Sequence, residues 1–165
     1  MREPVLVIFK PDAMKKRLVG DVLTKFEQSS LDLVAAKVIN PTREKTEKHY
    51  EHLKEKPFFQ KQVKFFMGEE YFEKGLLFFI FFGENAVQVC RDIAGATHPE
   101  EAKPTTVRGS YGRVNNKDIY ENVVHVSSSL GAAEREIKLW FNPGDIEMML
   151  FSTTLDNNKQ KRIWV

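Results

Sequence analysis

Hydrophobic and polar residues alternate along this chain with two different periods, one typical of strands and one typical of helices. Residues 5–10 are rich in β-branched side chains and residues 31–39 alternate, so both segments predict strands. The apolar run 76–82 predicts a buried strand, and the short segment 123–126 predicts another. Because Pro11 cannot donate a hydrogen bond to a sheet, we expect the first strand to end there in a turn.

Between these strands, the spacing of the apolar residues predicts helices. The expected helices cover residues 19–28, 43–53, 57–67, 84–93 and 130–140. Thr42 is a favourable N-cap for the second helix, and Pro57 separates the second from the third, which predicts a helical hairpin. Residues 94–121 are expected to form a long irregular loop, and loops of that length often carry function.

The order of these elements favours one α+β domain spanning residues 1–165. No repeat, low-complexity segment or flexible linker divides the chain. The order reads as βαββαβ with an inserted helical hairpin, a long loop before the last strand and a closing helix. It predicts a ferredoxin-like antiparallel sheet covered by helices.

Charge and cysteine content exclude several classes of protein. The chain has 25 Lys and Arg against 23 Asp and Glu, and its formal net charge of +2 is too small for dedicated nucleic-acid or membrane-surface binding. Cys90 is the only cysteine, so no intrachain disulfide is possible and a reducing cytoplasm is the simplest location. The longest apolar run, 76–82, is far shorter than the ~20 residues of a membrane helix, and we expect neither an anchor nor a targeting segment.

His125 is the first candidate for chemistry, because it interrupts an apolar strand. Alternation places Val123, His125 and Ser127 on one face of that strand. A histidine there is either a core residue satisfied by a hydrogen bond or a functional group. In the following helix, Glu136 lies at one edge of the apolar stripe and Glu134 at the other. Either carboxylate would orient the imidazole, so periodicity leaves that choice open.

Cationic and hydroxyl side chains form a second candidate group. It comprises Lys10, Arg91, Arg108, Thr97, Thr105 and Thr106. Arginine binds phosphate oxygens with a rigid planar fork and lysine with a mobile charge, so the group suits a polyphosphate. Each cation taken alone is more simply explained as a solvated surface charge.

Two aromatic side chains flank the break in the helical hairpin. Phe58 either stacks on a nucleobase or closes the core of the hairpin with Phe59, and Tyr50 lies on the other side of the break. The chain contains no GxxxxGK[ST], no GxGxxG after a strand and no GxSxG. These absences argue against P-loop enzymes, Rossmann dehydrogenases and α/β-hydrolases.

Several segments resemble motifs of the nucleoside diphosphate kinase family, in the same order and at the same spacing. They are VIFKPDA at 7–13, HYEHLKEKPFF at 49–59, GATHPEEAKPTTVRG at 95–109, NVVHVS at 122–127 and AEREIKLWF at 133–141. The resemblance runs from Val5 to Trp164. It implies transfer of the γ-phosphate of a nucleoside triphosphate, typically ATP, to a nucleoside diphosphate, in two ping-pong steps.

By position, the resemblance makes His125 the phosphorylated nucleophile, Glu136 its orienting partner and Ser127 a neighbour in the active site. The implied phosphate ligands and transfer-assisting groups are Lys10, Tyr50, Arg91, Thr97 and Arg108. Lys10 and Asn122 would also lie near the ribose hydroxyls, with Phe58 stacked on the base. The implied cofactor is Mg²⁺, held mainly by the nucleotide phosphates. The family forms tetramers or hexamers, and the tail KRIWV favours a hexamer.

This chain also departs from the family pattern. After His125 the family usually has Gly, Ser, Asp and Ser, whereas residues 126–129 are Val, Ser, Ser and Ser. Gln62 replaces an apolar residue that usually supports the aromatic ring on the base. Segments 69–75 and 112–121 are a few residues longer than in common members. The second segment is either a solvated insertion or a contact with the sugar or base.

Two alternatives compete with the kinase interpretation. RGSYGRV at 108–114 resembles a signature of RNA-recognition modules, but Ser110 replaces the aromatic residue that would stack on a base. The other alternative is a catalytically altered family member that acts as a nucleotide-binding regulatory protein. A direct phosphate-transfer assay separates the three hypotheses.

Overall fold

The structure, a computed structural model, describes residues 1–71, 75–115 and 119–165. Its centre is a four-stranded antiparallel sheet in the order β2-β3-β1-β6. The strands are β1 (Arg2–Phe9), β2 (Asp32–Ile39), β3 (Leu76–Glu84) and β6 (Val124–Val126). The four predicted strands and the ferredoxin-like α+β class are therefore confirmed.

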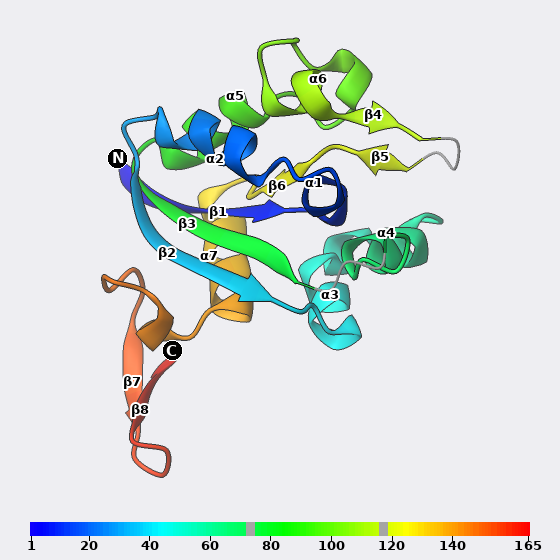
Figure 1. The fold of residues 1–165 in the computed structure, drawn as a ribbon. Helices are drawn as coiled ribbons and strands as arrows, with labels where there is room; N and C mark the ends of the chain where they lie inside the picture. The colour runs from blue at the N-terminus through cyan, green and yellow to red at the C-terminus, as the bar shows by residue number, and fades with distance from the viewer. Residues whose placement is uncertain (72–74, 116–118) are drawn as a thin grey trace.

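Helices cover both faces of this sheet (Figure 1). One face packs against α1 (Pro11–Lys15), α2 (Val19–Glu27), α5 (Ala86–Ala94) and α6 (Val107–Tyr111). The other packs against α3 (Arg43–His49), α4 (Phe59–Phe66) and α7 (Leu130–Trp140). Strand β1 supplies both cores, with Val5, Val7 and Phe9 on one face and Leu6 and Ile8 on the other. That double burial explains why its sequence is apolar from Pro4 to Phe9.

Hydroxyl side chains set where several helices begin. The hydroxyl of Thr42 accepts from the backbone N–H of Lys45 at the start of α3, as predicted. Ser129 caps α7 in the same way. The predicted turn at Pro11 is wrong: Pro11 begins α1, because a proline fits the first helical position, where its missing N–H is not needed.

The interpretation of residues 94–121 as irregular is also wrong. The segment contains a 3₁₀ turn η2 (Pro99–Glu101), helix α6 and the strands β4 (Arg113–Val114) and β5 (Tyr120–Glu121), which form a two-stranded hairpin. These elements are too short to show a period, and side chains stabilise them locally. The second predicted helix likewise ends early, as α3 followed by the 3₁₀ turn η1 (Glu51–Leu53).

The C-terminal region adds elements that the sequence pattern did not indicate. A 3₁₀ turn η3 (Pro143–Asp145) leads to the hairpin of β7 (Thr153–Asp156) and β8 (Lys161–Trp164). The indole N–H of Trp164 donates to the carbonyl of Phe141 at 2.8 Å, which ties the hairpin to the end of α7. Over the described residues, the helices are all too short or too polar to cross a bilayer.

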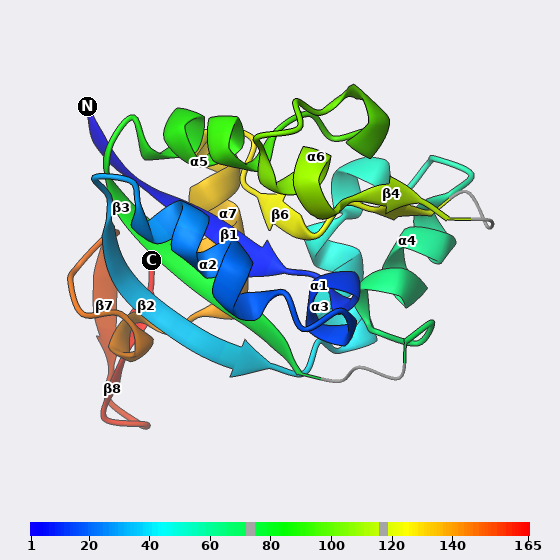
Figure 2. The ribbon, with the colours of Figure 1, turned by 45° about the horizontal axis from the view of Figure 1, so that its top comes forward.

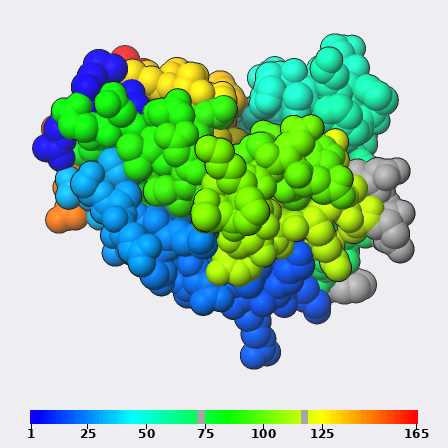
Figure 3. Space-filling model, turned by 90° about the horizontal axis from the view of Figure 1, so that it is seen from above, coloured from blue at the N-terminus to red at the C-terminus, as the bar shows by residue number. Residues whose placement is uncertain are grey.

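Seen after a 45° turn, α3 and α4 lie at one end of the sheet, beside β4 and β5 (Figure 2). The space-filling view from above shows the same two regions meeting at that end of the molecule (Figure 3). The carboxyl end of β1, with Lys10, points towards this meeting place. The fold therefore gathers segments that are far apart in the sequence, and most of the candidate residues lie there.

Candidate active site

His125 lies in the middle of β6, with its side chain 18% exposed, and Glu136 lies behind it on α7. The Nε2 atom of His125 is 2.9 Å from Oε2 of Glu136. The hydroxyl of Ser127 donates to the same oxygen at 2.7 Å. Glu134 instead pairs with Lys138, one turn away on the solvent side of α7. The structure thus resolves the choice between the two carboxylates in favour of Glu136.

Electrostatics keep Glu136 ionised. Burial alone would raise the pKa of its carboxyl, but His125 and the Ser127 hydroxyl lower that pKa to about 2. An ionised carboxylate only accepts hydrogen bonds, so the proton in the contact belongs to Nε2 of His125. In a neutral imidazole with this contact, the lone pair lies on the other ring nitrogen, Nδ1.

The turn just before His125 is strained. Val123 has a φ of 69°, a left-handed value that is costly for a β-branched residue. Its N–H donates to the carboxylate of Asp12 at 2.9 Å, and its carbonyl accepts from the N–H of Lys10 at 2.9 Å. This geometry corrects one expectation: Val123 packs in the same core as Val124 and Val126 and does not share the face of His125.

Two buried cations, Lys10 and Arg108, line the same hollow as His125. The ammonium of Lys10 donates to Oδ1 of Asn122 at 2.6 Å and lies 4.7 Å from the ring centre of Phe65. Burial lowers the pKa of Lys10 to about 8. The guanidinium of Arg108 donates to the carbonyls of Gly95 and Val124, at 2.7 and 2.9 Å, and burial lowers its pKa to about 10.

One donor of Arg108 has no acceptor within the described protein. Within the described parts of the chain, the buried Nε of Arg108 has no hydrogen-bond partner. Arg91 is exposed on α5 and lines the hollow that contains His125. The charge of Arg91 lowers the pKa of Arg108 further. Mutually repelling, partly desolvated cations are costly unless an anion binds between them.

Asn122 connects the site to the loop that follows α5. Its amide donates to the carbonyl of Thr97 at 2.8 Å while its oxygen accepts from Lys10. Thr97 is exposed beside the hollow. The other two predicted hydroxyls are not brought there, because Thr106 caps α6 with its oxygen and Thr105 is exposed outside the lining.

The aromatic residues around the break in the helical hairpin lie in different surroundings. Phe59 is buried in the core, whereas Phe58 is 49% exposed at the rim of the hollow. Tyr50 is buried at 7% exposure and also lines the hollow, and burial raises its pKa well above the usual phenol value. Phe58 is therefore free to stack on a flat ligand, and Tyr50 remains a neutral hydroxyl.

Sequence reasoning missed His49, although it lies within one of the quoted motifs. Its ring centre is 4.5 Å from that of His125, nearly at right angles, and its Nδ1 accepts from the indole of Trp140 at 3.2 Å. Burial, reinforced by His125, holds the pKa of His49 well below its usual value, so the ring is neutral. The signal that would have found it is the i, i+1 pairing with Tyr50, which also packs on His125.

Most of the predicted site residues line one hollow of about 430 Å³: Lys10, Tyr50, Phe58, Arg91, Thr97, Arg108, Asn122 and His125. Lys10, Arg91 and Arg108 supply positive charge, Phe58 supplies an aromatic face, and His125 supplies an imidazole oriented by Glu136. Among the described residues that line the hollow there is no carboxylate. Such a site suits an anion of several phosphates joined to an aromatic group.

Comparisons with known proteins agree with this class. Residues 3–146 match the family model described as nucleoside diphosphate kinase. The chain is 43% identical over 145 residues to the nucleoside diphosphate kinase of Pyrococcus furiosus, covering 87% of this chain and 86% of that protein.

Solved structures of similar proteins support the same conclusion. The Aquifex aeolicus nucleoside diphosphate kinase superposes with a TM-score of 0.80 at 33% identity, covering 88% of this chain and 99% of its own. A Borrelia burgdorferi nucleoside diphosphate kinase, solved with vanadate and ADP as a transition-state mimic, gives 0.78 at 29% identity, covering 95% of each chain. This chain belongs to the nucleoside diphosphate kinase family, and the predicted family, fold and phosphotransferase class are confirmed.

Proposed function

We propose that this chain transfers the γ-phosphate of a nucleoside triphosphate to a nucleoside diphosphate through a phosphohistidine on His125. The observation that carries the proposal is the contact of His125 Nε2 with the ionised Glu136, which leaves Nδ1 as the free nucleophile in a cationic hollow. In the first step Nδ1 attacks the γ-phosphorus, the bond to the bridging oxygen breaks, and the diphosphate leaves with the electron pair. In the second, a terminal oxygen of another diphosphate attacks the phosphohistidine and frees the imidazole.

Each surrounding residue has a separate role in this mechanism. Arg108 and Arg91 neutralise the transferring phosphoryl group, and Lys10 and Thr97 hold the remaining phosphates. Tyr50 places a neutral hydroxyl beside His125. Ser127 fixes the carboxylate of Glu136 through its 2.7 Å hydrogen bond. These roles rest on the geometry of the hollow.

The nucleoside would lie towards the mouth of the hollow. Asn122 and Lys10, already bonded to each other at 2.6 Å, are placed to meet the ribose hydroxyls. The half-exposed ring of Phe58 offers a stacking surface that accepts any base, because every base has a π-face.

Mg²⁺ fits this site only as a partner of the nucleotide. Mg²⁺ prefers hard oxygen ligands, whereas the nearest cluster of metal-ligating types consists of His49, His125 and Glu136. The described lining of the hollow offers cations and no carboxylate. The ion would therefore be held by phosphate oxygens and supply charge neutralisation there, while the residues of the chain bind the rest of the polyphosphate.

We further propose that residues 1–165 form a single domain, that the chain acts in the cytoplasm and that it assembles into a homo-oligomer, a hexamer rather than a tetramer. The continuous sheet with cores on both faces supports one domain. The exposed apolar residues on β2 and on the C-terminal hairpin support assembly.

Incubation with γ-labelled ATP tests the mechanism directly. The protein should acquire acid-labile, base-stable label and pass it to an added nucleoside diphosphate. His125→Ala should lose labelling and steady-state transfer together. Near-normal transfer by that variant would exclude His125 as the nucleophile, and binding of nucleotide by the native chain without any transfer would favour the regulatory alternative.

A further inference from the structure

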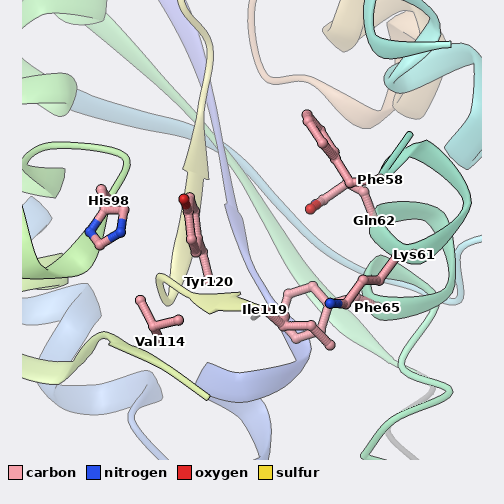
Figure 4. Close-up of a pocket in the computed structure, with 8 residues that line it drawn as sticks. All are labelled: Phe58, Lys61, Gln62, Phe65, His98, Val114, Ile119 and Tyr120. Carbon is pink, nitrogen blue, oxygen red and sulfur yellow. The ribbon is translucent and has the colours of Figure 1, made fainter. Parts of the chain in front are cut away.

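A second cavity of about 460 Å³ adjoins the hollow that contains His125. Helix α4 forms one wall with Phe58, Gln62 and Phe65, and the β4–β5 hairpin forms the other with Val114, Ile119 and Tyr120. Figure 4 shows these side chains around the cavity, with His98 beside Tyr120. Phe58, Gln62 and Tyr120 line both cavities, so the two spaces lie side by side.

The hairpin wall is anchored by one carboxylate, that of Glu121. Arg113 donates to it from the facing position of β4 with two nitrogens, at 2.8 and 3.1 Å. The ammonium of Lys16 at the end of α1 lies 2.7 Å away, and the hydroxyl of Tyr71, which follows α4, donates at 2.6 Å. Asn115 adds a longer contact at 3.4 Å.

This carboxylate joins three separate parts of the molecule. Glu121 is only 1% exposed although Arg113 is 63% exposed, so the arginine covers it from the solvent side. Burial alone would raise the pKa of Glu121, but the bonds from Arg113, Lys16 and Tyr71 hold that pKa at about 2. The group is therefore a fixed anion with its acceptor sites filled, and such charge-assisted bonds are strong.

The segments that meet at Glu121 are those whose length departs from the family pattern. Residues 72–74 and 116–118 lie outside the described residues, but the ends that are described converge here. Tyr71 packs edge-on against Phe65 at 5.8 Å, and Phe65 lies in the α4 wall. Asn115 and Ile119, which continue the two strands beyond Val114 and Tyr120, exchange two hydrogen bonds of 3.1 Å and so extend the pairing of β4 with β5. Asn122, the proposed ribose ligand, follows Glu121 directly.

We infer that Glu121 is a positioning residue: it fixes the β4–β5 hairpin opposite α4 and so sets the width of the cavity that receives the nucleoside part of the substrate. This inference rests on the proposed function for the identity of the ligand. It makes a selective prediction. Loss of the anchor weakens binding of ligands that carry a nucleoside and spares ligands that are phosphate alone, because the phosphates contact Lys10, Arg91 and Arg108 in the other hollow.

The test is calorimetric binding of Mg²⁺-ADP and of Mg²⁺-pyrophosphate to the full chain and to Glu121→Gln. We expect the Kd for ADP to rise about tenfold, as the loss of one charge-assisted anchor implies, while the Kd for pyrophosphate stays within about twofold. Glu44→Gln is the matched control, because Glu44 also pairs with one lysine but on the exposed face of α3. It should change neither constant.

Two milder variants guard against a folding defect in Glu121→Gln. Tyr71→Phe removes one hydrogen bond and Arg113→Gln removes one partner with its two bonds, and each leaves the carboxylate paired with the other residues. Each should therefore weaken ADP binding in the same direction by a smaller factor. Equal weakening of ADP and pyrophosphate, or no weakening of either, would overturn the inference. Because binding is measured without turnover, a native chain that binds ADP but fails to become labelled would reject the proposed function while this test remains decisive.

Discussion

At the residue scale, the charged groups of the site are mostly buried, and most of them are paired within the protein. Glu136 is satisfied by His125 and Ser127, whereas the buried Nε of Arg108, within the described structure, is not satisfied at all. A free donor of this kind is inexpensive only when the ligand supplies the acceptor. The arrangement therefore predicts which residues stabilise the transition state of phosphate transfer and which residues only bind the substrate.

Arg108 is expected to act on the transferring phosphoryl group. Arg108→Ala should lower kcat by roughly 10²–10³-fold, the usual cost of losing one aligned donor from a transition state. The thermal midpoint should change less than that of a core variant, although the bonds to Gly95 and Val124 are lost too. Steady-state kinetics check this: a rise in KM with unchanged kcat would show that Arg108 binds ground state and transition state equally.

The lowered pKa of Lys10 predicts that kcat/KM depends on pH above neutrality. Burial lowers its pKa to about 8, so its charge is present below that pH and lost as the pH rises through it. Because kcat/KM reports the free enzyme, it should fall as the pH passes about 8, whereas kcat should fall only at higher pH, since bound phosphates stabilise the ammonium. Lys10→Gln should have a lower kcat/KM without this step. If the variant retains the step, another group causes it.

The sequence identified most residues of the site because their types are rare in apolar surroundings, but it could not choose among neighbours. Glu134 and Glu136 both flank an apolar stripe, and only packing decides which one meets His125. His49 was missed because its contact with His125 joins α3 to β6, which are far apart in the sequence. Glu121 escaped for a different reason: its partners Lys16 and Tyr71 come from distant parts of the chain.

At the element scale, strands and long helices were predictable because each has one apolar face or two. The strands β1 and β3 have continuous apolar runs and were placed within a few residues. The errors fall on short elements. Helices α1 and α6 have five residues each and strands β4 and β5 have two each, too few to establish a period. Tertiary contacts such as those of Glu121 stabilise them instead.

Helix α7 carries Glu136, so the contribution of its N-cap to stability is worth testing. Ser129 caps its first turn by accepting from the N–H of Ala132 at 3.1 Å. Ser129→Ala should cost about 1 kcal/mol, the usual value of such a cap, and lower the thermal midpoint by a few degrees. The exposed Ser30, which precedes β2, provides the control variant Ser30→Ala. Equal midpoints for the two variants would mean that the cap contributes nothing.

At the scale of the whole molecule, a single chain leaves apolar residues exposed on the edge strand β2 and on the C-terminal region. Strand β2 lies at the edge of the sheet, where backbone groups lack a neighbouring strand on one side. Its Val38 is 65% exposed, and Met149 and Leu155 are exposed on the C-terminal region. Exposed apolar residues on an open edge strand are typical of surfaces that another subunit covers.

The proposed hexamer gives this surface a measurable consequence. Light scattering of the native chain should give about 115 kDa, six times the 19.1 kDa of one chain, rather than the roughly 76 kDa of a tetramer. Val38→Lys should shift the mass downward, because it places an unpaired charge where a partner would desolvate it, whereas the near-isosteric Val38→Thr should keep the native mass or shift it less. A native mass near 76 kDa would replace the hexamer by a tetramer. A native mass of one chain would show that β2 is not covered by another subunit, and its exposed valine would then have no role in assembly.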